Sequence, residues 1–240
     1  GLKGAGFLVE KGLVRPDVAI VGEPTSLRLV RAQRGACWLR VTTRGKAAHG
    51  SAPERGRSAI QDMAEIVLRL TETMPDITHP IVGGPSINVG TIRGGEKVNI
   101  VPAGCVIEID RRTIPEESRD SVLASVSAAI DLAKERFPDL DAVVEVDFFA
   151  EPFEVREGST TVAAVSAALE DATGSPAQLM GFRGASDARF LSEAGTDVVV
   201  CGPGDIALAH TARESIDLAE LERAAVAYAL AFARLLAPAA

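Results

Sequence analysis

The order in which strand-like and helix-like segments alternate constrains the fold of this chain more than any other feature. Four segments have the alternating or β-branched character of strands, and two repeat apolar residues as amphipathic helices do. The strands are predicted over residues 37–44, 86–93, 105–112 and 142–149, and the helices over residues 58–73 and 118–136. Their order, β-α-β-β-α-β, is the ferredoxin-like arrangement, so we predict one such domain over residues 34–149.

The flanking sequence has a different character, with short strands that are apolar throughout. These strands are predicted over residues 17–22, 178–182 and 197–201, and helices over residues 160–173 and 217–236, the last capped by Asp217. Continuous apolar strands indicate a sheet that is covered on both faces. We therefore predict an α/β domain from residues 1–33 and 150–240, with the ferredoxin-like domain inserted in it. Three clear strands are few for such a sheet, which suggests that part of the domain is absent, and residues 224–236 are expected to be a buried helix.

Charge and composition exclude two classes of partner. The chain has 33 acidic and 25 basic residues and a formal charge of −8, which disfavours nucleic acid because phosphate backbones bind clustered Lys and Arg. No apolar run approaches the roughly 18 residues of a membrane-spanning helix, and no signal peptide is recognisable. Cys37, Cys105 and Cys201 lack CxxC spacing and are expected to be buried free thiols. These observations predict a cytoplasmic protein with no membrane partner.

The three histidines differ in their surroundings. His210 lies in a Gly/Pro-containing loop just after the strand 197–201, and ligands of open α/β sheets bind at that end of the strands. It is a candidate metal ligand or general base, with a loop histidine of no special role as the alternative. His49 lies in a second loop of Gly and Pro and is also a candidate, whereas His79, before Pro80, is expected to be solvated.

Glu23 follows the strand 17–22 and is expected at the same sheet edge as His210. Together the two side chains offer one oxygen and one nitrogen ligand for a metal such as zinc, although a capping role for Glu23 is the alternative. A catalytic zinc needs about three protein ligands plus water. Further ligands are therefore required.

Three other positions have side chains suited to binding a substrate. Arg112 ends a strand and can hold a carboxylate through two hydrogen bonds or form a surface ion pair. Ser186 and Asp187 precede a probable helix, whose backbone N–H groups suit a carboxylate, and a helix cap is the alternative. Asn99 is by default a turn residue.

Taken in order, the motifs of this chain resemble a known enzyme family. The motifs are Gly22-Glu23-Pro24-Thr25, Ala48-His49-Gly50-Ser51-Ala52-Pro53, Asn88-Val89-Gly90, residues 98–102, residues 110–116, Ser186-Asp187-Ala188-Arg189-Phe190 and residues 202–210. Over essentially all 240 residues the chain resembles the di-zinc amidohydrolase and exopeptidase family of acetylornithine deacetylase, succinyl-diaminopimelate desuccinylase, aminoacylase and carboxypeptidase G. The resemblance implies a partial zinc-peptidase-type α/β domain with an inserted ferredoxin-like dimerisation domain, or lid.

The resemblance also implies roles for individual residues. It makes Glu23 a ligand of one zinc and His210 a ligand of the other, and it places His49 in the active site of the partner subunit, where it helps hold the developing oxyanion. It assigns Asn99 and Arg112 to substrate binding, Arg112 at the α-carboxylate, and it places Ser186 near the substrate. Ala185 departs from the Thr that desuccinylases carry at this position.

The function implied is hydrolysis of an N-acyl amino acid by a homodimer that pairs through its lid and holds two zinc ions, with cobalt or manganese as alternative metals. The family's other metal ligands and its general base would precede Gly1, so the resemblance predicts an N-terminally truncated chain that is inactive by itself. A carboxypeptidase or dipeptidase acting on short peptides is one alternative. A non-catalytic dimerisation or binding fragment is the other.

Overall fold

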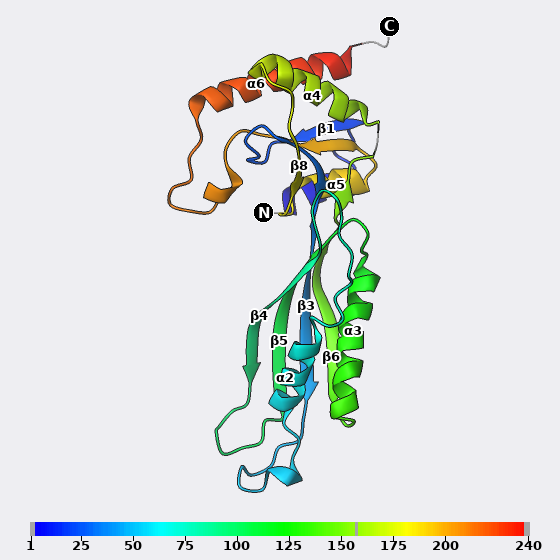
Figure 1. Cartoon of the computed structure of the whole chain (residues 1–240), viewed down its shortest axis with the longest axis vertical. Coiled ribbons are helices and arrows are strands. Elements are labelled where there is room, and N and C mark those ends of the chain that lie inside the picture. The colour runs from blue at the N-terminus through cyan, green and yellow to red at the C-terminus, as the bar shows by residue number, and fades with distance from the viewer. Residues whose placement is uncertain (1–2, 157, 238–240) are drawn as a thin grey trace. The chain divides into compact units, whose positions relative to one another are not determined.

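The computed structural model describes residues 3–156 and 158–237, which divide into two compact units (Figure 1). The α/β unit comprises Gly1–Arg34 and Pro152–Ala240, and the lid unit comprises Gly35–Glu151. Each unit has its own hydrophobic core.

The lid unit is a four-stranded antiparallel sheet with two helices. Its strands are β3 (Gly35–Arg44), β4 (Ser86–Gly94), β5 (Gly104–Thr113) and β6 (Asp141–Ala150), and its helices are α2 (Ala59–Arg69), α3 (Arg119–Arg136) and the short η1 (Pro53–Arg55). The sheet order is β4-β5-β3-β6, so β4 and β6 are the edge strands. The β-α-β-β-α-β order predicted from the sequence is confirmed.

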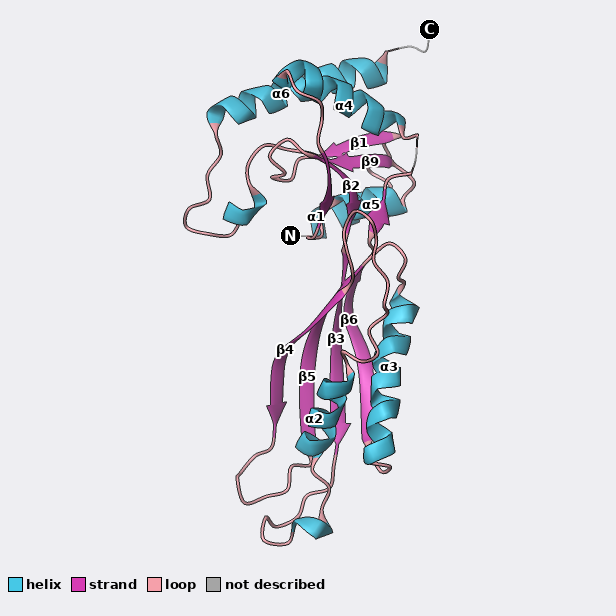
Figure 2. Cartoon of the chain, in the orientation of Figure 1, coloured by secondary structure: helices cyan, strands magenta, loops and turns pink. Residues whose placement is uncertain are grey.

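Alternation along the lid strands separates a core face from an open face. Cys37, Leu39 and Val41 of β3 are buried under α2 and α3, while Trp38 between them is half-exposed on the opposite face. Both helices lie on the same side of the sheet (Figure 2). The hydroxyl of Ser58 caps α2 by accepting a hydrogen bond from the backbone N–H of Gln61.

The α/β unit has a mixed sheet with helices on both faces. Its strands are β1 (Val18–Val21), β2 (Leu29–Gln33), β7 (Phe153–Glu154), β8 (Leu179–Phe182) and β9 (Asp197–Val200), and its helices are α1 (Lys3–Glu10), α4 (Thr160–Thr173), α5 (Ala188–Glu193), α6 (Leu218–Leu236) and the short η2 (Ile206–Leu208). The order is β1-β9-β2-β7, with β8 also paired to β2, and β1 runs parallel to β9. Helices α4 and α6 cover one face, while α1 and α5 lie on the other (Figures 1 and 2).

Two expectations about burial are wrong. Helix α6 is not buried as a whole, because its fully buried positions are a stripe of small residues, Ala224, Ala227 and Ala231, while Phe232 and Leu236 are exposed. His79 is buried rather than solvated. Its Nδ1 accepts hydrogen bonds from the backbone N–H groups of Ile81 and Val82, which stabilises the ring inside a turn.

The three cysteines are buried and free, as predicted. Within the described residues, no helix combines the length and the hydropathy that crossing a bilayer requires.

The chain enters and leaves the lid unit on neighbouring strands. Only Arg34 separates β2 from β3, and Ala36 at the start of β3 pairs with Ala150 at the end of β6. On the α/β side, Ala32 of β2 pairs with Glu154 of β7.

Candidate metal site and substrate-binding residues

Strands β1 and β9 bring Glu23 and the loop that carries His210 to one edge of the sheet. Val21 pairs with Val200, and the backbone N–H of Cys201 donates to the carbonyl of Val21 at 3.0 Å. A Cβ atom on Gly202 would lie 2.5 Å from the carbonyl oxygen of Glu23, so only glycine permits this close approach. Glu23 is thereby held against the start of the loop at residues 201–217.

Thr25 joins the turn after β1 to the same loop. Its buried hydroxyl donates to the carbonyl of Arg28 at 2.7 Å and accepts from the N–H of Gly202 at 3.1 Å. Its own N–H donates to the carbonyl of Gly202, also at 3.1 Å. These hydrogen bonds of Thr25 fix the backbone that carries Glu23. In the sequence, the Glu-Pro-Thr motif was the only sign of this role of Thr25.

His210 lies in an exposed part of that loop, with a left-handed backbone φ of 63°. Its backbone N–H donates to the Glu214 carboxylate at 2.8 Å. A cavity of about 410 Å³ lies beside it, and the residues next to both candidate ligands, Gly22, Pro24 and Ala209, contribute to its lining. Clefts outside the carboxyl ends of strands are where open α/β sheets bind ligands.

The donors at this edge suit a metal ion in kind but not in number. Burial raises the pKa of Glu23, and the negative charge of Asp187 raises it further. A cation bound there would offset both effects, because it favours the charged carboxylates. Within the described ranges, however, no three His, Cys, Asp or Glu side chains gather as a metal site requires. Glu23 and His210 are therefore an incomplete set for zinc, which takes about three protein ligands.

Ser186 lies at the start of α5 and is buried. Its hydroxyl donates to the Oε1 atom of Gln33 and accepts a long 3.4 Å hydrogen bond from the N–H of Ala188. These contacts give Ser186 a role in fixing the Ser186-Asp187 turn. Gln33, wholly buried at the end of β2, was not singled out from the sequence, because the segment Leu29–Gln33 also contains Arg31 and has no apolar period.

The lid unit brings His49 and Asn99 together in two adjoining loops. The backbone N–H of Gly50 donates to the carbonyl of Asn99 at 2.8 Å, and Val101 donates to Ala48 at 2.9 Å. A Cβ on Gly50 would lie 3.0 Å from the Asn99 carbonyl, which explains the glycine after His49. Both candidate side chains are exposed.

Arg112 is located elsewhere in the lid unit, near the far end of β5. It is half-exposed and bonded to the carboxylate of Asp110 at 2.9 Å, while its neighbour Arg111 is buried and ion-paired with Glu117. The loop of His49 adjoins the other end of β5, because Gly45 donates to the carbonyl of Ala103. Arg112 is eight positions after Gly104 along the strand, a span of roughly 27 Å.

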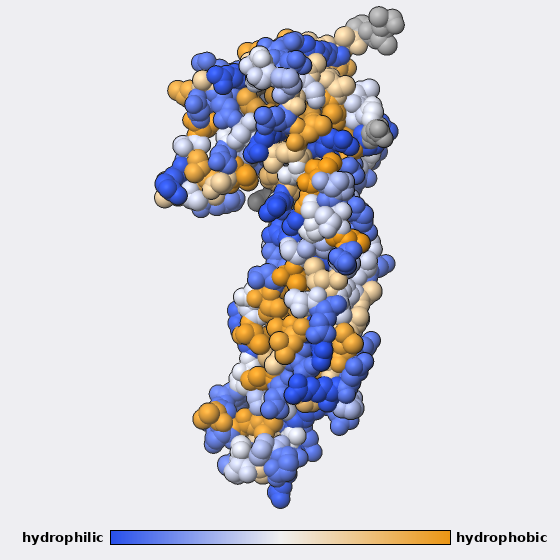
Figure 3. Space-filling view, viewed as in Figure 1, coloured by the Kyte–Doolittle hydropathy of each residue, from blue (hydrophilic) through white to orange (hydrophobic). Residues whose placement is uncertain are grey.

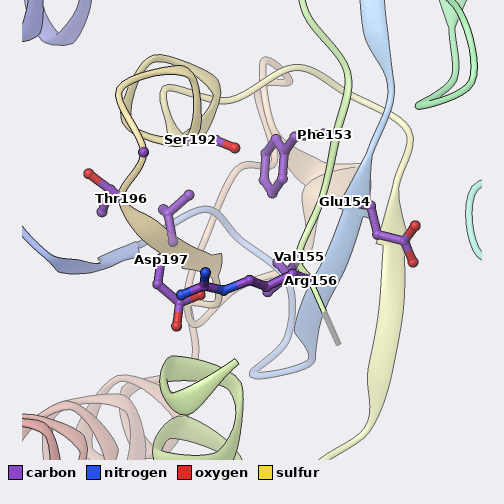
Figure 4. Close-up of a pocket in the computed structure, with 9 residues that line it drawn as sticks. Phe153, Glu154, Val155, Arg156, Ser192, Thr196 and Asp197 are labelled. Carbon is purple, nitrogen blue, oxygen red and sulfur yellow. The ribbon is translucent and has the colours of Figure 1, made fainter. Parts of the chain in front are cut away.

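A second cavity, of about 160 Å³, lies at the amino end of β9 (Figure 4). Asp197 lines it together with Arg156, whose guanidinium lies beside the carboxylate in the figure. Burial raises the pKa of Asp197, but hydrogen bonds from Ser159 and Thr161 and the charge of Arg156 outweigh it and lower the pKa overall. Asp197 is thus a charged group that stabilises the start of α4, at the sheet edge opposite Glu23.

Comparison with known proteins agrees with this architecture. Residues 31–137 match the peptidase dimerisation domain of the M20 family. The chain is 32% identical over 239 residues to the acetylornithine deacetylase of Myxococcus xanthus, covering 97% of this chain and 61% of that protein. The chain therefore contains the dimerisation domain of the M20 peptidase family.

Further comparisons give the same picture. The acetylornithine deacetylase of Proteus mirabilis is 32% identical over 231 residues, which is 92% of this chain and 57% of that protein. The solved structure of aminopeptidase PepT from Bacillus cereus has a TM-score of 0.81 at 24% identity, over 99% of this chain and 62% of that one. A tripeptidase from Staphylococcus aureus has a TM-score of 0.77 at 21% identity, over 98% and 61%. The chain spans about 60% of the length of the curated relatives it matches.

Proposed function

We propose that the whole protein hydrolyses the amide bond of an N-acyl amino acid, the kind of reaction that the name acetylornithine deacetylase gives to its relatives, and that this reaction depends on zinc. The observation that carries the proposal is the cavity at the carboxyl ends of β1 and β9, bordered by the neighbours of Glu23 and His210. The 32% identity to an acetylornithine deacetylase supports the deacylase over the family's other reactions. Three free buried thiols support the prediction that the protein works in the reducing cytoplasm.

Glu23 and His210 would hold zinc together with ligands beyond the described set. When bound, zinc polarises a carbonyl group and lowers the pKa of a coordinated water, and cobalt or manganese would supply the same chemistry. The turn at Glu23-Pro24-Thr25 would hold the backbone of Glu23 in place without the metal, because both the N–H and the hydroxyl of Thr25 are bonded to Gly202 in the loop after β9.

The lid residues would bind the substrate. Arg112 would exchange its bond to Asp110 for a two-point contact with the substrate's α-carboxylate, while His49 holds the developing oxyanion and Asn99 lies beside it. The span of roughly 27 Å along β5 is too long for one small substrate to touch both ends. This separation supports the proposal that His49 serves the site of a partner subunit.

A homodimer would form at the β4 edge of the lid. Edge strands present unpaired backbone groups, and β4 is one of the two edges here. Apolar side chains line the same side: Ile60 and Leu68 on α2 are 37% and 65% exposed, and Ile92 on β4 is 56% exposed. Orange residues over α2 and the adjacent strands are visible in Figure 3. Two copies that pair β4 with β4 would continue the sheet and bury these residues.

The dimer is tested by the mass in solution. We expect Leu68→Glu to convert the dimer to a monomer in analytical ultracentrifugation. Val143→Lys is the matched control, because Val143 is 38% exposed on β6, the opposite edge of the same sheet. A dimer that survives Leu68→Glu and dissociates with Val143→Lys would contradict the proposed edge.

The reaction is tested with the whole protein, zinc and a panel of N-acetyl, N-succinyl and N-formyl amino acids together with dipeptides, measuring release of free amine. We expect metal-dependent cleavage of an N-acyl amino acid, with Arg112→Lys raising KM because lysine cannot make the two-point contact. Glu23→Ala should weaken zinc binding at least about 100-fold. Cleavage of the dipeptides alone would establish the peptidase alternative, and no release of amine from any substrate would overturn the proposal.

The incomplete ligand set favours a second hypothesis for the 240 residues by themselves. In this hypothesis they form a non-catalytic dimerisation or binding unit. Calorimetric titration with zinc distinguishes the two. One weak zinc or none per chain supports the non-catalytic hypothesis, whereas two tightly bound zinc ions would show that these residues suffice for the metal site.

A further inference from the structure

The imidazole of His49 is held by the residue two positions further along the chain. Its Nδ1 atom accepts a hydrogen bond from the backbone N–H of Ser51 at 3.2 Å and lies 2.7 Å from the Ser51 hydroxyl. Among the described residues, Nε2 has no hydrogen-bond partner, and the side chain is exposed. One ring nitrogen is therefore engaged by the loop and the other is free to contact a ligand.

The two contacts determine where the proton of the neutral ring lies. A backbone N–H can only donate, so the Nδ1 atom facing it must be the acceptor. A neutral imidazole has one protonated nitrogen, and the proton is thus on Nε2. The Ser51 hydroxyl can rotate to donate to Nδ1 as well, which adds a second interaction favouring the same tautomer.

We propose that Ser51 is a positioning residue that fixes His49 in the Nε2–H tautomer, so that the neutral ring presents a hydrogen-bond donor to an oxygen that gains negative charge. The inference rests on the proposed function, in which His49 holds the oxyanion. A donor suits that task, whereas a neutral Nε2 without its proton would turn a lone pair toward the oxyanion and repel it.

The loop around His49 is stiff enough to impose this arrangement. The carbonyl of His49 accepts from the N–H of Ala52 at 2.9 Å, which closes a tight turn around Ser51. His49 also forms a bridge with Ile100, and Gly50 is bonded to Asn99. The N–H of Ser51 is thereby directed at the ring rather than at solvent.

His79 shows that the chain uses the same contact elsewhere, because its Nδ1 accepts from the N–H groups of Ile81 and Val82. His79 is buried, so it offers an internal reference for the Nε2–H tautomer in the same sample.

Nitrogen-15 NMR of the imidazole rings at neutral pH tests the proposal without any activity. The three histidines are assigned with His49→Gln and His210→Gln variants. We expect an unprotonated Nδ1 and a protonated Nε2 for His49, as for His79. Ser51→Ala removes the hydroxyl and keeps the N–H, and should admit a measurable fraction of the other tautomer. Ser51→Pro removes both donors and should admit more.

Trp38 fluorescence during urea unfolding shows whether each variant keeps the lid unit folded, because Trp38 is the chain's single tryptophan. If Ser51→Pro unfolds the lid, the His49 tautomer of the unchanged protein decides, because Ser51→Ala keeps the N–H that faces Nδ1. A proton on Nδ1 in the unchanged protein would overturn the proposal, and so would a His49 tautomer that stays the same in a folded Ser51→Pro variant.

Substitution of His49 in the active whole protein provides the second test. Glutamine places its amide donor near the position of Nε2, whereas asparagine places it near Nδ1. We expect His49→Gln to retain at least about tenfold more kcat than His49→Asn, with similar KM, because loss of one oxyanion donor costs about 100- to 1,000-fold. Equal loss in both variants would contradict a donor role. The predicted tautomer without any hydrolysis would overturn the proposed function and leave the Ser51 contact established.

Discussion

Replacing Asp197 by asparagine should destabilise the α/β unit while leaving the lid unit unchanged. Asp197 is the first residue of β9, and its carboxylate accepts from the hydroxyl of Ser159 at 2.7 and 2.9 Å and from the N–H of Thr161 at 3.2 Å. Both donors belong to the first turn of α4 or its cap. The carboxylate therefore connects a central strand to the start of a helix.

The magnitude follows from these contacts. Hydrogen bonds to a charged group contribute about 1.5–3 kcal/mol each, and a negative charge at a helix start adds roughly 0.3–1 kcal/mol. Asparagine keeps one acceptor oxygen and loses the charge. We expect Asp197→Asn to lower the free energy of unfolding of the α/β unit by about 2 kcal/mol at neutral pH.

Acid should remove this difference. Burial raises the pKa of Asp197, but its hydrogen bonds and Arg156 outweigh burial, so the pKa is lower in the folded protein than in the unfolded chain. The contribution is therefore complete above the unfolded pKa of about 3.9 and is lost as the pH falls through the folded pKa. The stabilities of the variant and the unchanged protein should converge there.

Urea unfolding can follow the two units separately. Tyr228, the only tyrosine, reports on the α/β unit, and Trp38, the only tryptophan, reports on the lid. Asp171→Asn is the matched control, because Asp171 lies on the same helix α4 in an exposed pair with Arg234, and such pairs contribute less than about 1 kcal/mol. A loss in Asp197→Asn no larger than in this control, or one that persists in acid, would refute the reasoning.

Three further predictions concern close packing and buried groups. Gly202→Ala should lower the free energy of unfolding by about 1–3 kcal/mol and weaken zinc binding, because the new Cβ would displace the backbone of Glu23. Thermal unfolding measures the first effect and metal titration the second. Glu117→Ala should cost about 3–5 kcal/mol by leaving Arg111 buried without its carboxylate partner, seen as a lower urea midpoint by lid fluorescence. Burial raises the pKa of the Cys37 thiol to about 11, so iodoacetamide at neutral pH should label it far more slowly in the folded protein than in urea.

The parts of the fold that the sequence predicted are those with a clear period. Strand β3 alternates between a buried and an open face, and α2 repeats its apolar residues at helical spacing, so both were recognisable. Strand β2 was missed because it is central and buried almost throughout, which removes the alternation that marks a strand. β7 has only two residues and exists because β2 pairs with it.

Long-range polar contacts limited what could be foreseen about the candidate site. The rule that ligands bind at the carboxyl ends of strands led to Glu23 and His210, and their metal-binding roles remain predictions. The contacts of Thr25 with the loop after β9, and of Gln33 with Ser186, join residues more than 150 positions apart. Such pairs depend on the tertiary fold and leave no local periodic signal. The wrong expectation for His79 has the same origin, since a turn that encloses the ring resembles a solvated loop in sequence.

The adjacency of Ala36 and Ala150 has an evolutionary consequence. Paired residues on neighbouring strands have Cα atoms about 4.5–5.5 Å apart, so the segment between them starts and finishes almost at one point. A short turn could replace all of Gly35–Glu151 without stretching the polypeptide, and that segment could equally be transplanted as a cassette. Selection can thus alter the residues of this segment, His49 among them, while the sheet edge that carries Glu23 and the loop of His210 is inherited unchanged.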